Sequence, residues 1–172
     1  MPQNPQIHLV SRPQGEPLAE NFQLVVQDTP ALTDQQVLVK HEYLSLDPYM
    51  RGRMNDVKSY TLPQPLHSVM IGGTVGEVVE SRHPDFVPGD KVVGMGGWQT
   101  YSVVDASAPG ALRKIDTTHV PISHFLGAVG MPGVTAWHGL VRIIDPKPGQ
   151  TLCVSAASGA VGSAFEIGRA HV

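Results

Sequence analysis

The sequence predicts a mainly β domain of barrel-like or sandwich-like type, followed by the start of an α/β nucleotide-binding domain. Three observations lead to this expectation. Residues 6–115 contain short alternating runs of apolar and polar residues, separated by turns rich in glycine and proline. Residues 123–143 change to the spacing of helices. Residues 151–168 then combine an apolar run, a turn of small residues and a helical pattern.

Composition narrows the class of protein. A chain of 172 residues is long enough for one domain with a core and part of another. Its net charge of −3 offers no basic footprint for nucleic acid. The sequence has no apolar run long enough for a membrane span and no signal-peptide core at its start. With a single cysteine, an internal disulfide is excluded, and we expect a cytoplasmic protein.

The strand candidates of the first part follow one another through short turns. The fourth candidate contains glycines, which indicate a bulge or a close approach of another backbone, and the turn after it closes at Pro88-Gly89-Asp90. The segment around Pro48 has no clean period, so we expect a loop that ends in one helical turn, and residues 58–67 form a proline-containing surface loop. The strands are predicted at residues 6–10, 22–27, 37–42, 71–80, 91–94, 98–104 and 112–115.

The second part begins near residue 120, which gives an expected division into domains of residues 1–120 and 121–172. Helices are predicted over residues 123–130 and 135–143, with Met131-Pro132-Gly133 as a break between them. The segment 145–150 contains two prolines and a glycine and is predicted to be a linker into the last strand.

The stretch after this linker has the residue types of a phosphate-binding corner. Residues 151–155 are predicted to form a strand, and a helix follows the small-residue turn. Backbone N–H groups at such a helix start can reach a pyrophosphate only where no Cβ holds it away. Gly159 and Gly162 fit the second and third glycines of the fingerprint, whereas Ala157 stands where the first is usual. The predicted cofactor-binding residues are therefore Ser158, Gly159, Ala160, Val161 and Gly162. A glycine- and alanine-rich turn that binds no nucleotide is the alternative.

This order of domains resembles the medium-chain dehydrogenase/reductase superfamily, in which a GroES-like domain precedes a Rossmann domain. Residues 88–92 resemble its Gly-Asp-x-Val turn, and residues 156–162 resemble its Ala-x-x-Gly-x-x-Gly loop. Residues 44–54 and 130–136 are similar to segments of the zinc-independent double-bond reductases, the branch of curcumin, prostaglandin and alkenal reductases. Residues 11–13 and 97–99 resemble the bacterial curcumin-reductase group.

The resemblance implies an NADPH-dependent enzyme that reduces the C=C bond of an enone or enal. It places Tyr49 beside the nicotinamide and the substrate, as the candidate catalytic residue. It also implies that Met131, Gly133 and Thr135 contact the cofactor. The alternatives are that Tyr49 only packs its loop and that Thr135 is an ordinary first-turn residue. Asp47 and Arg51 are expected to hold the loop in place rather than react, and Arg53 ranks behind Tyr49 as a candidate.

Zinc ligands are missing at the positions where zinc-dependent relatives carry them. An ungapped comparison puts Asp47 at the first position and Gly72 and Gly73 at the second. We therefore expect no metal, and the histidines are read as surface or core residues. Without zinc, hydrogen-bond donors must stabilise the enolate that forms when hydride reaches the β-carbon of the substrate. Trp98 and Trp137 are expected to be packing residues.

The resemblance also implies that the nucleotide domain continues beyond Val172. The 172-residue chain by itself is therefore expected to bind NADPH poorly and to be inactive, and the whole enzyme is compatible with a homodimer. Residues 168–172 depart from the family pattern. Two other functions stay open at this point: quinone reduction on the same scaffold, and a non-enzymatic GroES-like association module.

Overall fold

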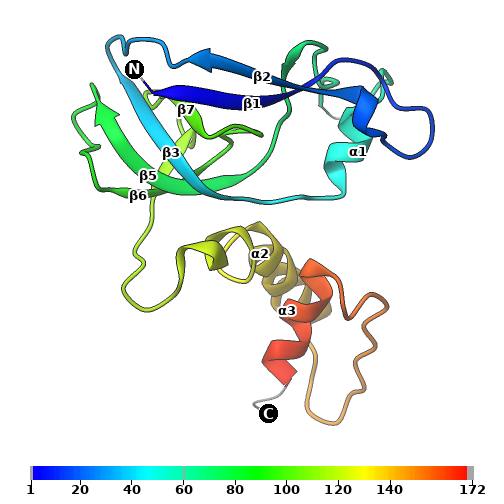
Figure 1. Cartoon of the computed structure of the whole chain (residues 1–172). Helices are drawn as coiled ribbons and strands as arrows, with labels where there is room; N and C mark the ends of the chain where they lie inside the picture. The colour runs from blue at the N-terminus through cyan, green and yellow to red at the C-terminus, as the bar shows by residue number, and fades with distance from the viewer. Residues whose placement is uncertain (1, 60, 170–172) are drawn as a thin grey trace. The chain divides into compact units, whose positions relative to one another are not determined.

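The computed structural model describes residues 2–59 and 61–169. It divides into two compact units, Met1–Asp116 and Thr117–Val172. The described first unit contains the strands, one short α-helix and the 3-10 helix η1 (Ala19–Asn21), and the second contains helices (Figure 1). No helix among the described residues is long and apolar enough to cross a membrane.

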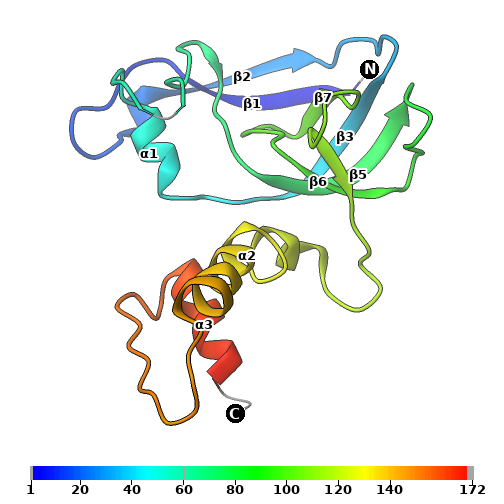
Figure 2. The ribbon, with the colours of Figure 1, turned by 180° about the vertical axis from the view of Figure 1, so that it is seen from behind.

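The first unit is built from two antiparallel sheets. The 3-stranded sheet has the order β2-β1-β4, and the 5-stranded sheet has the order β7-β3-β5-β6-β8. Strands β3 and β5 curl strongly, which gives the half-barrel shape visible from both sides (Figures 1 and 2). The mainly β, GroES-like fold expected from the sequence is therefore confirmed. The strands are β1 (Gln3–Leu9), β2 (Phe22–Asp28), β3 (Gln36–Leu44), β4 (Ser68–Val69), β5 (Thr74–Ser81), β6 (Lys91–Gly94), β7 (Tyr101–Asp105) and β8 (Leu112–Lys114).

Two apolar clusters form the core of this unit. One lies within the 5-stranded sheet and contains Val37, Val39, Val78, Phe86 and Val92. The other lies under the short helix α1 (Tyr49–Arg53) and contains Leu9, Met50, Met54 and Met70. Burial of each such side chain contributes roughly 1.5–3 kcal/mol, so the second cluster fixes α1 on the barrel.

Gly76 explains why β3 and β5 pair with a bulge. A Cβ at this position would lie 2.0 Å from the carbonyl oxygen of Lys40. The register between the two strands shifts between His41 and Tyr43, next to this contact. The close approach expected from the glycines of this segment is thus confirmed, since only glycine lets the two backbones come this near.

The turn at Gly89 and Asp90 is closed by its own side chain. Gly89 has a φ of +96°, a conformation that glycine adopts without strain. The backbone N–H of Val87 donates to Asp90 Oδ2 over 2.8 Å. Lys114 Nζ lies 2.7 Å from the same oxygen, so the Gly-Asp pair joins this turn to β8.

The second unit contains helical segments that pack on one another. A 3-10 helix, η2 (Ile122–Leu126), precedes α2 (Met131–Trp137), which continues directly as the π-helix η3 (His138–Ile144). Helix α3 (Ala160–Arg169) contacts α2. Phe165 of α3 lies against Gly139, where a Cβ would stand 3.2 Å from its ring.

The expected helix break at Met131-Pro132-Gly133 is wrong, because α2 begins there. Proline is favoured in the first turn of a helix, where its missing N–H costs nothing. The glycines on both sides of Pro132 are needed for packing. A Cβ would lie 2.2 Å from the carbonyl oxygen of Phe125 at Gly130, and 1.8 Å from that of Ala128 at Gly133.

The expected strand over residues 151–155 is also wrong within the described part of the chain, where residues 151–154 have no regular secondary structure and Ser155 belongs to a turn. A strand exists only when a neighbour accepts and donates its backbone hydrogen bonds. No other strand of the described second unit offers such a ladder. The departure from the family pattern at residues 170–172 lies outside the described residues.

Candidate functional site

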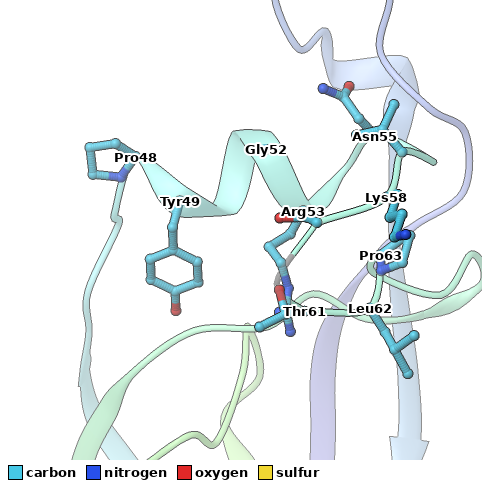
Figure 3. A pocket seen from close by; sticks show the side chains of 11 residues that line it. Pro48, Tyr49, Gly52, Arg53, Asn55, Lys58, Thr61, Leu62 and Pro63 are labelled. Carbon is cyan, nitrogen blue, oxygen red and sulfur yellow. The ribbon is translucent and has the colours of Figure 1, made fainter.

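Helix α1 carries the candidate catalytic residue on a firmly held first turn. The helix starts after Pro48, and the backbone N–H of Met50 donates to the carbonyl oxygen of Asp47 over 3.1 Å. Met50 faces the core and is buried. Tyr49 and Arg53 lie one helical turn apart, so their side chains share a face. Figure 3 shows both side chains extending to the same side of α1.

Arg51 anchors this helix to the segment between β1 and β2. Its Nε and Nη2 atoms donate to the carbonyl oxygen of Gly15 over 3.0 and 2.7 Å, and Nη1 donates to Asn55 Oδ1 over 2.7 Å. The expectation that Arg51 holds the loop in place is confirmed. Asp47 contributes through its backbone carbonyl rather than through a salt bridge with a described residue.

Arg12 and Gln64 fix the far end of α1. Arg12 Nη1 donates to the carbonyl oxygen of Met54 over 2.8 Å. The backbone N–H of Gln64 donates to the carbonyl oxygen of Arg53 over 2.7 Å. The buried Gln64 side chain also donates to the carbonyl oxygen of Val69 and accepts from the N–H of Ile71. The end of α1 and the loop after it are therefore held to the same part of the barrel.

A pocket of about 270 Å³ lies between α1 and this loop. Tyr49, which is half-buried, lines one side, and Thr61 and Leu62 line another (Figure 3). The described lining contains basic residues but no carboxylate. The residues that line it are Pro48, Tyr49, Gly52, Arg53, Asn55, Val57, Lys58, Ser59, Thr61, Leu62 and Pro63.

Two polar atoms of this lining are buried without a hydrogen-bond partner among the described residues: Arg53 Nε and Thr61 Oγ1. Figure 3 shows the Arg53 side chain reaching from α1 toward Thr61. A buried donor left unpaired costs about 1–3 kcal/mol, and more when the group is charged. The pocket thus offers unused hydrogen-bonding capacity next to Tyr49.

The small-residue turn of the second unit brings Ser158, Gly159, Ala160, Val161 and Gly162 together at the start of α3. The N–H of Gly159 donates to the carbonyl oxygen of Ala156 over 2.9 Å, which closes the turn. A Cβ at the buried Gly162 would lie 1.8 Å from the same oxygen. At the exposed Gly159, the nearest atom would be 3.2 Å away. Gly162 is therefore required for internal packing. At position 159 a side chain would meet a less severe steric conflict within the chain.

Met131, Gly133 and Thr135 all lie on α2, in the same unit as this turn. The Thr135 hydroxyl donates to the carbonyl oxygen of Met131 over 2.7 Å, so it bonds within its own helix. The N–H of Gly133 donates to the carbonyl oxygen of Gly127. What Thr135 keeps for a ligand is the acceptor capacity of its exposed hydroxyl oxygen. Contact of these three residues with a cofactor stays a prediction.

The two tryptophans differ in their surroundings. Trp98 stacks on Phe22 with ring centroids 5.6 Å apart and packs against the cluster under α1, so its expected packing role is confirmed. Trp137 is 51% exposed, and Arg142 covers one face of its ring at 5.2 Å. Its ring packs against Arg142 on one face, and its expected packing role otherwise stays a prediction.

Gly72, one of the positions that the ungapped comparison aligns with zinc ligands, lies in closely packed surroundings. A Cβ at Gly72 would lie 2.6 Å from Leu44 Cδ1, so even a small side chain would collide there. Among the described residues, no group of three or more histidine, cysteine or carboxylate side chains gathers as a metal site would require. His41 is a partly buried residue whose Nε2 lies 2.9 Å from Ser102 Oγ, and burial lowers its pKa to about 4.

Sequence reasoning ranked Arg53 behind Tyr49 and did not single out Thr61. The available signal was the spacing of Tyr49 and Arg53, which places a tyrosine and an arginine on one helical face. The position of Thr61 gives no such signal. It depends on how the loop after α1 folds back, and that loop has no periodic pattern.

Comparison with known proteins identifies similar chains. The family model described as the N-terminal domain of oxidoreductase matches residues 5–112. A curated NADPH-dependent curcumin reductase of Escherichia coli (strain K12) is 50% identical over 155 residues, which is 90% of this chain and 44% of that protein. A 2-alkenal reductase (NADP(+)-dependent) of Nicotiana tabacum is 46% identical over 127 residues, covering 73% of this chain and 36% of its own.

A solved structure agrees with these relatives. The crystal structure of CurA in complex with NADPH from Vibrio vulnificus matches with a TM-score of 0.86 and 46% identity, over 96% of this chain and 49% of that one. The 172-residue chain therefore spans about half the length, or less, of the relatives that it matches.

Proposed function

Because this chain belongs to the oxidoreductase N-terminal domain family, within the zinc-independent double-bond reductases of the medium-chain dehydrogenase/reductase superfamily, we propose that the whole protein reduces the C=C bond of α,β-unsaturated carbonyl compounds with NADPH. The observation that carries the proposal is the pocket beside α1, where Tyr49 stands next to an unpaired arginine donor. Its relatives named for curcumin, alkenal and prostaglandin reduction agree with this substrate class.

Tyr49 has the chemistry that such a reaction requires. When hydride adds to the β-carbon of an enone, negative charge collects on the carbonyl oxygen, and the α-carbon then takes a proton. A phenol O–H directed at that oxygen stabilises the charge, and it does so more strongly where water is excluded. The half-buried position of Tyr49 on a helix held by Arg51 and Gln64 supports this role, because a rigid donor needs no reorganisation during the reaction.

The residues of the small turn fit a dinucleotide. NADPH supplies the hydride when it is bound. The first N–H groups of α3 have no carbonyl partner within the helix, which suits a pyrophosphate. The glycine at position 159 leaves space for a close approach from outside the turn. We propose that Ser158, Gly159, Ala160, Val161 and Gly162 hold the phosphates, with Met131, Gly133 and Thr135 toward the nicotinamide.

The catalytic tyrosine and the phosphate-binding turn belong to different domains. We propose that the domains are residues 1–120, with the catalytic tyrosine, and residues 121–172, the first part of the nucleotide-binding domain. The chain covers 44% of the curcumin reductase and 49% of the CurA chain that it matches. The 172-residue chain by itself is then expected to bind NADPH poorly and to be inactive.

The test is an assay of the complete protein with NADPH and benzylideneacetone, a neutral enone. Consumption of NADPH with formation of benzylacetone, the saturated ketone, is expected. Formation of the allylic alcohol would contradict the proposal, as would an absence of any turnover with enones and enals. A quinone assayed in parallel distinguishes enone reduction from quinone reduction on the same scaffold.

A further inference from the structure

The arginines around α1 fall into two kinds. The guanidinium group of Arg51 donates to the backbone carbonyl oxygen of Gly15, and that of Arg12 donates to the backbone carbonyl oxygen of Met54. Arg53 makes no such bond, and its buried Nε has no partner among the described residues. A guanidinium has N–H donors only and stays charged in proteins. The guanidinium groups of Arg51 and Arg12 therefore have hydrogen-bond acceptors within the described chain, whereas Arg53 Nε has none.

The charged residues that line the pocket also favour an anionic ligand. Lys58 is a second basic residue of the pocket, and no acidic residue lines it among the described residues. The nearby Asp56 points elsewhere, since its carboxylate lies 4.0 Å from Arg12 Nε. A small pocket with positive charge and no internal counter-charge attracts an anionic group from solution.

Thr61 supplies a second point of contact. Its buried Oγ1 also has no partner among the described residues, and the Arg53 side chain reaches toward it (Figure 3). A carboxylate between them could accept from the guanidinium and from the hydroxyl at once. Charge-assisted bonds of this kind are roughly twice as strong as neutral ones.

We propose that Arg53, with Thr61, is a specificity-determining site for an anionic oxygen group of the substrate, so that the preferred ligands are carbonyl compounds that carry a carboxylate. Tyr49 then serves the reacting carbonyl, and Arg53, one helical turn away, holds the charged end of the same molecule. The assignment rests on the proposed function for the enone part of the substrate. The anion site itself is tested without any turnover.

Binding of two matched probes to the 172-residue chain makes this test. β-Benzoylpropionate carries a ketone and a carboxylate, and β-benzoylpropionamide has the same shape without the charge. Both lack the reactive double bond, so the exposed Cys153 is not alkylated. Isothermal titration gives the two dissociation constants. The acid is expected to bind about tenfold more tightly than the amide, the ratio that one charge-assisted contact provides.

Substitutions of Arg53 and of a control arginine test which residue causes the preference for the acid. Arg53→Gln is expected to bring the acid-to-amide ratio close to one, and Arg53→Lys to retain part of it. Arg113→Gln removes the same charge from the exposed strand β8 and is expected to leave the ratio unchanged. Circular dichroism and thermal melts check that each variant is folded.

Three results would overturn the assignment: equal binding of the two probes, no binding of either, or a ratio that survives Arg53→Gln. Competition by NADP would overturn it too, because the arginine would then serve a cofactor phosphate. The two proposals can fail separately. If the unchanged chain prefers the acid, Arg53→Gln removes that preference, and the benzylideneacetone assay fails, then the proposed reaction is refuted and the anion site stands.

Discussion

The guanidinium of Arg51 donates twice to the carbonyl oxygen of Gly15, from Nε over 3.0 Å and from Nη2 over 2.7 Å. This pair joins two segments that are distant in the sequence and fixes the helix that carries Tyr49 and Arg53. The positions of Tyr49 and Arg53 therefore depend on Arg51, which holds α1 in place.

The first prediction concerns this anchor. Arg51→Gln is expected to lower the free energy of unfolding by about 2 kcal/mol, because hydrogen bonds to a charged group contribute about 1.5–3 kcal/mol. Urea unfolding monitored by tryptophan fluorescence measures the change. Arg113→Gln, which removes a charge from the exposed strand β8, is the control and should cost less than about 0.5 kcal/mol. Equal losses in the two variants would contradict the anchoring role.

A second prediction uses two glycines of the first unit. Gly76→Ala is expected to destabilise by about 1–3 kcal/mol, because its Cβ would lie 2.0 Å from a backbone oxygen of β3. Gly52→Ala meets nothing within 4 Å and lies inside α1, so it should stabilise by about 0.5–1 kcal/mol. Urea unfolding of both variants gives the comparison. An unchanged stability of Gly76→Ala would show that the two strands can separate there.

The third prediction is a pH dependence from His41. Burial lowers the pKa of His41 to about 4 in the folded chain, whereas the unfolded value is 6.5. Between these values the unfolded chain binds the proton more strongly, so stability falls as the pH decreases through this window. At pH 5 the loss is about 2 kcal/mol relative to pH 7, from 1.36 kcal/mol for each pKa unit.

His41→Gln removes this source of pH dependence and keeps a side chain that can hydrogen-bond to Ser102. The variant is expected to lose much less stability than the unchanged chain between pH 7 and pH 5, as measured by urea unfolding at both values. The lowered pKa values of Asp90 and Glu77, caused first by hydrogen bonds from Lys114 and Lys91, act at lower pH. Parallel pH curves for the variant and the unchanged chain would contradict the assignment.

The strands could largely be predicted from the sequence because sheet residues alternate with a period of two. The prediction of residues 91–94 coincides with β6, and Gly76 marked the close approach before its partner Lys40 was known. Strand β4 was missed, because Ser68 and Val69 are too short a run to show any period.

The errors have physical causes of the same kind. The strand expected at residues 151–155 needs a paired neighbour, and pairing is not a property of the segment itself. Pro132 was read as a helix breaker, although proline ends a helix in its interior and suits its first turn. That Arg53 and Thr61 line one pocket depends on how an aperiodic loop folds back, which no local pattern specifies.

The fourth prediction concerns metal. The residues at the zinc positions of the relatives are Asp47, Gly72 and Gly73, which do not form a ligand set. Dialysis of the complete protein against a chelator is therefore expected to leave the rate of enone reduction unchanged, and added zinc should not raise it. A loss of activity on dialysis that zinc restores would refute the metal-free mechanism.

The fifth prediction concerns Tyr49 directly. Tyr49→Phe removes one hydroxyl donor from the pocket and preserves the ring that packs against the cluster under α1. The turnover rate of the complete protein with benzylideneacetone should fall about 100-fold, as when one oxyanion donor is lost. Circular dichroism checks that the variant is folded, and a folded variant with unaltered turnover would leave Tyr49 a packing residue only.

The most direct measurement is the position of the transferred hydrogen. The complete protein is supplied with benzylideneacetone and NADPH that carries deuterium at the transferable position, and the product is analysed by NMR. Deuterium at the β-carbon of the saturated ketone is the result that this account predicts. Deuterium on the former carbonyl carbon, in an allylic alcohol with its double bond intact, would contradict it.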